Sequence, residues 1–295
     1  MKKVLISGGT GLIGNYLQVT LKNLGYEVNI LTRNPKAPNA FYWNYQSNEI
    51  DMNCFEEVSC IIHLAGENIG DKRWTNQQKQ LIIDSRVKST QLLYNSIKNN
   101  NIAIEHFITA SGLGYYGNTT TVVDETAPIG NDFLAEVCQH WENAALQFSN
   151  IGTKVTIARL GIVMSKNGGV LPKLLASTKF HINTIFGDGN QYVSWIHIKD
   201  AVQIFAWLLQ NQLEGIYNLC APNPVSYNTL YRAINQKLNI VAMSIPIPKI
   251  LLQTTLGEMS TMLLTSNNCS ATKITNSGYN FEFETIEKCL ANLLN

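Results

Sequence analysis

Residues 3–14 read KVLISGGTGLIG, and this stretch decides the fold. A short apolar run over residues 3–7 leads into a glycine-rich turn with the spacing Gly8-x-x-Gly11-x-x-Gly14, and a helical pattern follows. Glycines at such a turn let the backbone approach a pyrophosphate, and the helix N-terminus offers free N–H groups and a favourable dipole. Glycine spacing alone is weak evidence, but its place between a strand and a helix predicts a dinucleotide phosphate cradle.

The strand–helix alternation that begins here continues through the first two thirds of the chain. The expected strands cover residues 3–7, 27–32, 40–43, 60–65, 106–111 and 154–160, and the expected helices cover 12–24, 76–99 and 133–148. Such alternation implies parallel strands joined by right-handed crossovers. We therefore expect an α/β fold with a doubly wound (Rossmann), mostly parallel sheet.

The pattern becomes less regular after residue 160, and the two prolines of APNP (221–224) mark a break. We predict a dinucleotide-binding Rossmann domain over residues 1–221, in which residues 166–192 contribute to the substrate side. Residues 222–295 are expected to form a smaller C-terminal α/β region on the same substrate side.

Composition excludes several classes of protein. The chain has 22 Lys and Arg against 21 Asp and Glu, a net charge of +1, which gives no electrostatic footprint for nucleic acid or an anionic membrane. No apolar run reaches the roughly 20 residues of a membrane span. The six cysteines form no paired metal-type spacing, so we expect no metal site and reduced, mostly buried thiols in a cytoplasmic protein.

The end of the second expected strand indicates which cofactor binds. NAD-binding folds usually carry an acidic residue there to hold the ribose 2′-OH, whereas this chain has Thr32 and Arg33. A cation beside a small hydroxyl suits a 2′-phosphate, which favours NADP(H) over NAD(H). The alternative is an exposed arginine without a ligand.

The glycine spacing resembles that of extended short-chain dehydrogenases/reductases, and further motifs resemble their atypical epimerase-family group. These motifs are HLAGENIGDKRW (63–74), SR (85–86), ITASGLGYYG (108–117), FLAEVCQHWE (133–142), GDGNQYVSWIHIKD (187–200) and APNP (221–224). Members are often labelled sugar-nucleotide epimerases and carry a C-terminal segment of unknown function. The resemblance implies bound NADP(H) with contacts from Gly8, Thr10, Gly11, Leu12, Ile13, Thr32, Arg33, Leu64, Ala65, Arg86 and Ile162.

One departure from the superfamily concerns its proton-transfer pair. Extended members use a tyrosine and, four residues on, a lysine whose charge lowers the tyrosine pKa from about 10. When the helix is aligned on Glu142, these positions hold Leu134 and Cys138. Leucine exchanges no proton, and a neutral thiol cannot replace an ammonium group. A further position, where nucleotide-sugar enzymes often carry an arginine, holds Val193, so the usual sugar-nucleotide epimerisation is disfavoured.

Other residues are candidates for the missing chemistry. Ser111, Tyr115 and Tyr116 follow the fifth expected strand, beside the expected nicotinamide, although the alternative for each tyrosine is a packed ring bonded to the backbone. Glu67 follows the fourth expected strand, as a substrate-cleft residue or as part of a self-bonded loop. In the family's His-x-x-Asp element, we interpret His197 as structural and Asp200 as a helix cap.

The sequence supports two hypotheses about function. The first is an NADP(H)-dependent oxidoreductase or epimerase-like enzyme that acts on an unidentified small carbonyl or hydroxyl compound. The second is a catalytically silent NADP(H)-binding protein with a redox-sensing or regulatory role. Neither the substrate nor the oligomeric state follows from the sequence.

Overall fold

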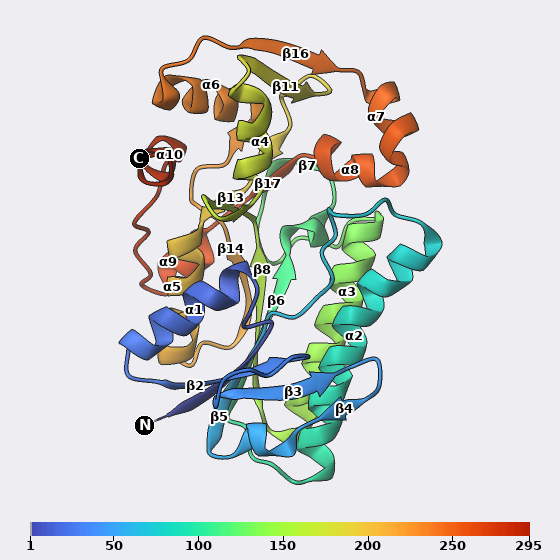
Figure 1. Cartoon of the computed structure of the whole chain (residues 1–295), viewed down its shortest axis with the longest axis vertical. Helices are drawn as coiled ribbons and strands as arrows, with labels where there is room; N and C mark the ends of the chain where they lie inside the picture. Colours follow the sequence, from blue (N-terminus) through green and yellow to red (C-terminus); the bar gives the residue numbers. More distant parts are fainter. Residues whose placement is uncertain (1) are drawn as a thin grey trace.

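Within residues 2–295, which the computed structural model describes, the chain is built around an eight-stranded sheet of order β14-β8-β6-β5-β1-β2-β3-β4 (Figure 1). Its strands are β1 (Lys3–Ser7), β2 (Glu27–Thr32), β3 (Ala40–Asn44), β4 (Glu49–Ile50), β5 (Val58–His63), β6 (His106–Gly112), β8 (Lys154–Leu160) and β14 (Gly215–Leu219). Only the β3–β4 pair is antiparallel among these neighbours. The expected doubly wound, mostly parallel sheet is confirmed.

Helices cover both faces of this sheet. On one face lie α1 (Leu12–Asn23) and α5 (Ile198–Gln210); on the other lie α2 (Asn76–Asn99), α3 (Phe133–Leu146) and η3 (Gln147–Ile151) (Figure 1). The alternation of side chains along β1 explains the two layers, because Val4 and Ile6 pack with α1 and α5 whereas Leu5 joins the opposite core.

The helix starts differ in a way that matters for function. Thr75 caps α2 by accepting from the Gln78 N–H at 3.2 Å, and Asp132 caps α3 by accepting from the Ala135 N–H at 2.9 Å. Helix α1 instead begins after Gly11, which has no capping side chain, and its first turn contains no acidic residue. Its first N–H groups are therefore free to bind an anion.

A smaller region sits at the upper end of Figure 1 and has its own apolar core, which includes Trp195, Tyr231 and Phe283. It contains α4 (Leu171–Thr178), β11 (Ile182–Phe186), α6 (Tyr227–Leu238), β16 (Met243–Ile247), α7 (Lys249–Leu256), α8 (Thr261–Leu264) and α10 (Ile286–Leu293). Strands β11 and β16 pair in parallel, so residues before and after the APNP break share one layer.

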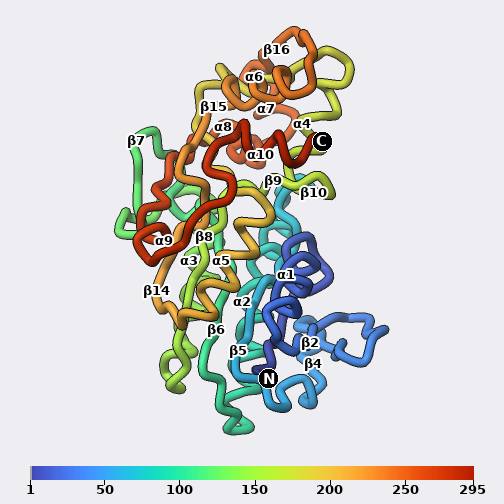
Figure 2. Tube along the Cα trace, turned by 90° about the vertical axis from the view of Figure 1, so that its left-hand side faces the viewer, coloured from blue at the N-terminus to red at the C-terminus, as the bar shows by residue number. Residues whose placement is uncertain are grey.

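Short strands and turns join the two regions. They are β7 (Thr119–Val123), β9 (Ile162–Ser165), β10 (Gly168–Gly169), β12 (Tyr192–Val193), β13 (Trp195–His197), β15 (Val225–Ser226), β17 (Asn267–Cys269) and η2 (Leu113–Tyr116). Of the remaining short elements, η1 (Met52–Phe55) packs beside β2 and β3, α9 (Thr272–Asn276) packs on β14, and η4 (Gly257–Ser260) connects α7 to α8. Strand β17 pairs with β7, and α9 after it packs on β14, so this segment returns to the large sheet before the chain ends at α10 in the smaller region (Figure 2).

The His-x-x-Asp element holds that returning segment. Asp200 accepts hydrogen bonds from the Tyr279 hydroxyl at 2.8 Å and from the backbone N–H groups of Glu282 and Phe283, each at 3.0 Å. The cap of α5 is the His197 side chain, whose Nδ1 accepts from the Lys199 N–H at 3.0 Å. The prediction of Asp200 as the cap was therefore wrong, because this buried carboxylate binds the C-terminal segment.

In the described part of the chain, no helix is long and apolar enough to cross a membrane.

Candidate functional site

A cleft of about 300 Å³ opens where β1, β2 and β5 end. Its lining comprises Gly8, Thr10, Gly11, Leu31, Thr32, Arg33, Trp43, Asn44, Tyr45, Leu64, Ala65, Gly66, Glu67 and Ser85. The carboxyl ends of parallel strands are where such sheets bind ligands. We call this the cofactor cleft, since most of the predicted cofactor residues lie in its wall.

The glycine turn forms the floor of the cofactor cleft. Gly8 has a φ of +71°, and a Cβ placed on it would lie 2.9 Å from the backbone nitrogen of Ala65. A Cβ on Gly14 would lie only 2.3 Å from the carbonyl oxygen of Gly8, so the turn depends on both glycines. The side chains of Leu12 and Ile13 do not line the cleft, but their N–H groups belong to the uncapped first turn of α1. This backbone fits a pyrophosphate.

A buried histidine supports the turn from behind. His63 is fully buried, with Nδ1 2.5 Å from the Ser7 hydroxyl and Nε2 3.1 Å from the Ser89 hydroxyl. Burial and then the charge of Arg86 lower the pKa of His63 to about 3, so the ring is neutral at physiological pH. The ring thus ties the ends of β1 and β5 to α2, a role that the sequence did not indicate.

The far end of the cofactor cleft is lined by polar side chains. Thr32 and Arg33 lie there, and Arg33 forms no ion pair within residues 2–295. Asn44 and Tyr45 join them from the end of β3; the Asn44 Oδ1 accepts from the Gln46 N–H at 3.0 Å. The side-chain N–H groups of Asn44 can therefore donate hydrogen bonds to a ligand. Sequence reasoning missed Asn44, although it directly follows the expected strand 40–43.

A second cavity, of about 320 Å³, lies beside the ends of β6 and β8; we call it the inner cavity. Its lining comprises Ile69, Arg86, Ser111, Gly112, Leu113, Gly114, Leu134, Val137, Cys138, Trp141, Leu160, Gly161, Ile162, Ser194, Met262 and Asn267. Arg86 connects the two spaces, because a Cβ on Gly66, in the cofactor cleft, would lie 3.0 Å from the Arg86 Cζ. Glu67, by contrast, lines the cofactor cleft, where its N–H donates to the Ser85 hydroxyl at 2.9 Å.

Arg86 is a cation without a carboxylate partner in the described part of the chain. Its Nη1 donates to the Ile82 carbonyl at 3.0 Å, and its Cζ lies 5.0 Å from the centre of the Trp141 ring. Burial lowers the pKa of Arg86 to about 10, which still leaves it charged at neutral pH. A negatively charged or carbonyl-bearing ligand would satisfy it.

The positions of the superfamily's acid–base pair open onto the inner cavity. Leu134 and Cys138 lie one turn apart on α3, and both are part of the cavity wall. Burial, and then the Glu142 charge, raises the pKa of the Cys138 thiol to about 11; its Sγ donates to the Gly112 carbonyl at 3.5 Å. Neither side chain exchanges a proton at neutral pH.

Ser111 belongs to a buried polar network behind the inner cavity. Its hydroxyl donates to Glu142 Oε1 at 2.7 Å, and Arg159 donates to both carboxylate oxygens, from Nε at 2.9 Å and Nη2 at 2.7 Å. Ser111 and Glu142 are each 4 % exposed and Arg159 is 1 % exposed. Burial opposes the charge of Arg159, but its bonds to Glu142 raise the Arg159 pKa above its usual value.

Tyr115 and Tyr116 do not line the inner cavity. The Tyr116 hydroxyl accepts from Arg159 Nη1 at 2.9 Å and donates to Asn218 Oδ1 at 2.7 Å, and burial raises its pKa. The Tyr115 ring lies over the Arg159 guanidinium, with Cζ 3.4 Å from the ring centre. Of the three catalytic candidates, the structure brings only Ser111 to the cavity, because the turn η2 directs both rings toward Arg159.

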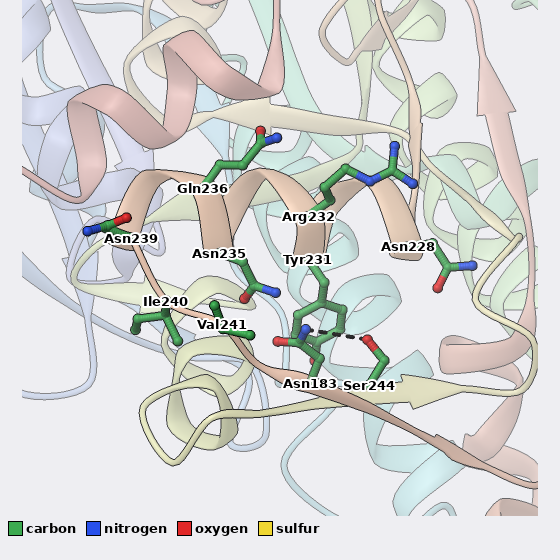
Figure 3. Close-up of a pocket in the computed structure, with 10 residues that line it drawn as sticks. All are labelled: Asn183, Asn228, Tyr231, Arg232, Asn235, Gln236, Asn239, Ile240, Val241 and Ser244. Atoms are coloured by element: carbon green, nitrogen blue, oxygen red, sulfur yellow. Dashed lines mark hydrogen bonds between the residues drawn. The ribbon is translucent and has the colours of Figure 1, made fainter.

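A third hollow, of about 530 Å³, lies between α6 and the β11–β16 pair, in the smaller region. Figure 3 shows its lining, in which Tyr231 and Asn235 of α6 face Asn183 of β11. Its ten lining residues, all within the described range, include no histidine, cysteine or carboxylate. The cofactor cleft and the inner cavity together are therefore the candidate active site.

Comparison with known proteins places the chain among epimerase-family proteins. The NAD dependent epimerase/dehydratase family matches residues 4–220, and a domain of unknown function (DUF1731) matches residues 247–293. An epimerase family protein of Staphylococcus aureus (strain NCTC 8325) is 34% identical over 306 residues, covering 100% of this chain and 99% of that protein.

Solved structures extend the comparison. The human epimerase family protein SDR39U1 (isoform 2), solved with NADPH, is 26% identical with a TM-score of 0.87, covering 99% of this chain and 98% of that one. A nucleoside-diphosphate sugar epimerase from Corynebacterium glutamicum is 29% identical with a TM-score of 0.80, covering 99% of this chain but 58% of that one.

Proposed function

The chain belongs to the NAD dependent epimerase/dehydratase family, and we propose that it is an NADP(H)-dependent oxidoreductase or epimerase-like enzyme acting on a small carbonyl or hydroxyl compound. The chain has the family's NAD(P)-binding fold. The observation that carries the proposal is the contact between the cofactor cleft and the inner cavity at Gly66 and Arg86, with Ser111 in the cavity wall. This arrangement gives a substrate a place next to the reactive end of a bound dinucleotide.

The choice of NADP(H) over NAD(H) rests on the far end of the cofactor cleft. Arg33 supplies a positive charge, and Thr32 and Asn44 supply a hydroxyl and amide N–H groups around the expected ribose 2′ position. No acidic residue occupies the end of β2, where a carboxylate would hold a free 2′-OH and repel a phosphate. The NADPH in the human relative's structure supports the same choice.

When bound, the nicotinamide would donate or accept a hydride. The chain's contribution is to position the substrate and exclude water: Leu134, Val137 and Trp141 form an apolar wall, and Ser111 orients the substrate oxygen. Such a wall favours a compound with an apolar body. Val193 is 2 % exposed, so the position where nucleotide-sugar enzymes often carry an arginine is in the core. This argues against a sugar-nucleotide substrate.

One observation favours a second function, that of a catalytically silent NADP(H)-binding protein with a redox-sensing or regulatory role. The two wall positions where the superfamily keeps its proton-transfer pair hold Leu134 and a neutral Cys138. A cofactor bound there would report the redox state of the NADP(H) pool without turnover. We rank this second, because such a protein has no need for an inner cavity beside the cofactor.

Binding and turnover measurements test both proposals. The purified chain is titrated with NADPH and NADH by fluorescence, and the NADPH complex is then screened by absorbance against a panel of carbonyl compounds, with NADP⁺ and hydroxyl compounds for the reverse direction. We expect tighter binding of NADPH than of NADH, and turnover on a compound with an apolar body. Tight binding without any turnover would favour the silent protein, and equal affinities would contradict the NADP(H) assignment.

A further inference from the structure

We propose that Glu142 is a positioning residue that makes Ser111 a hydrogen-bond acceptor toward the inner cavity, so that the site binds the hydroxyl form of its substrate in preference to the carbonyl form. This inference rests on the proposed function, since it takes the inner cavity as the substrate site. It names the functional group that the site selects.

The first step is the direction of the Ser111 hydrogen bond. Both oxygens of Glu142 accept N–H groups from Arg159, at 2.9 Å and 2.7 Å, and a carboxylate has no proton of its own to donate. The 2.7 Å contact between Ser111 Oγ and Glu142 Oε1 therefore uses the single hydroxyl proton of Ser111. Only the lone pairs of Ser111 remain for a ligand.

The Cys138 thiol is a second possible partner of the Ser111 hydroxyl, but it does not change the direction of the Ser111–Glu142 hydrogen bond. A hydrogen bond from the Ser111 hydroxyl is among the effects that lower the Cys138 pKa, so the thiol lies within its reach. A charged carboxylate is a much stronger acceptor than a thiol sulfur. The thiol proton is itself directed to the Gly112 carbonyl, at 3.5 Å. The proton of Ser111 thus stays on the Glu142 side, and burial of Arg159 keeps the ion pair in place.

The third step is that the other polar side chains of the inner cavity do not reverse the preference. The Ser194 hydroxyl donates to the Asn267 carbonyl at 2.8 Å, and the Asn267 amide donates to the Gly117 carbonyl at 2.7 Å. Arg86 can donate to an alcohol oxygen as readily as to a carbonyl oxygen. Ser111 does distinguish them, because an alcohol can donate to its oxygen and a ketone cannot.

The test compares matched pairs of neutral probes, cyclohexanol with cyclohexanone and 1-phenylethanol with acetophenone. Their dissociation constants are measured by NMR titration with the cofactor cleft filled by a tetrahydronicotinamide analogue of NADPH, which transfers no hydride. Because a neutral hydrogen bond contributes about 0.5–1.5 kcal/mol, each alcohol is expected to bind about two- to tenfold more tightly than its ketone. The same titrations without the analogue give the ratio of the ketone and alcohol dissociation constants when no cofactor analogue is bound.

Two variants connect the ratio to the network. Ser111→Ala removes the acceptor but leaves the Glu142–Arg159 pair, so the ratio should fall to about one. Glu142→Gln brings an N–H group into the network, which lets the Ser111 proton turn to the cavity; the ratio should then fall toward one or below it. A purely structural role of Glu142 would instead weaken both members of a pair equally.

Several results would overturn the inference. They are a ratio of one in the unaltered chain, a preference that persists in Ser111→Ala, and an absence of binding by every probe. Each leaves the NADPH and NADH affinities, and hence the proposed cofactor site, to be judged from their own titrations.

Discussion

The cofactor cleft and the inner cavity lie side by side at one edge of the sheet, yet they are built differently. The cofactor cleft presents backbone groups of the glycine turn and exposed polar side chains such as Arg33. The inner cavity is mostly apolar, and Ser111 and Arg86 are among its few polar side chains. In the cofactor cleft, a ligand can therefore bind largely to backbone groups. In the inner cavity, binding depends on side chains that one buried polar network holds in place.

Because of this difference, substitutions in the two regions should affect different properties of the protein. A surface cation can be removed without damage to the fold, so a variant at the exposed Arg33 should change affinity alone. A buried ion pair leaves an uncompensated charge when one partner is removed, so variants behind the inner cavity should change stability first. Four predictions test this contrast.

The largest effect is expected for Glu142→Ala. It leaves Arg159 buried without a counter-ion, which should lower the free energy of unfolding by about 3–5 kcal/mol in a urea titration. The matched control is Glu136→Ala on the same helix, whose exposed pairing with His140 at 3.8 Å should contribute less than about 0.5 kcal/mol. An equal decrease in the free energy of unfolding in both variants would mean that the buried network contributes no more to stability than an exposed ion pair.

Removal of Arg33 should act on affinity rather than stability. A charge-assisted bond contributes about 1.5–3 kcal/mol, so Arg33→Ala should weaken NADPH binding by about ten- to a hundredfold in a fluorescence titration. NADH lacks the 2′-phosphate, and its affinity should stay the same. Lys36→Ala, at a nearby exposed lysine outside the cleft lining, serves as the control. A parallel loss for NADH would contradict the assignment of Arg33.

The histidine beneath the glycine turn predicts a pH dependence. The pKa of His63 is lowered in the fold to about 3 from an ordinary value of 6.5. As the pH falls below 6.5, His63 becomes protonated in the unfolded chain but stays neutral in the folded chain. Folding stability therefore decreases with falling pH. Between about pH 7.5 and about pH 5 this loss should be about 2 kcal/mol.

His63→Asn should lose that share of the pH dependence. Urea titrations at the two pH values give the loss for each protein, and the difference between the losses isolates His63 from the other buried histidines, His106 and His197. The same loss in both proteins would show that His63 takes up its proton in the folded chain.

The smallest effect is expected for Cys138→Ala. The neutral thiol takes no part in proton transfer, so turnover on any substrate found should change little, whereas loss of a general acid–base group lowers rates by about 10²–10⁴-fold. The unfolding free energy should fall by about 1 kcal/mol, as for other small deletions in a core. Cys289→Ala, in the distant core of the smaller region, provides the comparison for packing alone. A hundredfold loss of turnover only in Cys138→Ala would assign the thiol a chemical role.

The order of the elements and the position of the phosphate cradle could be predicted from the sequence. Strands 3–7, 27–32 and 154–160 were predicted with the bounds that the structure has. The alternation of short apolar runs with helical patterns and the glycines of the first turn are local signals, so they can be recognised without knowledge of the packing. The same holds for Thr32 and Arg33, because the end of a strand and the end of a parallel sheet coincide.

The glycine turn after residues 3–7, and the presence of Leu134 and Cys138 at the usual Tyr and Lys positions, can be read from the sequence alone. Which of the three catalytic candidates lines the inner cavity depends on the packing of distant elements. Ser111, Tyr115 and Tyr116 lie within six positions of one another, and Glu142 and Arg159 reach them from other elements. Direction of a hydrogen bond depends on where distant donors and acceptors meet, and no local pattern in a sequence records that meeting.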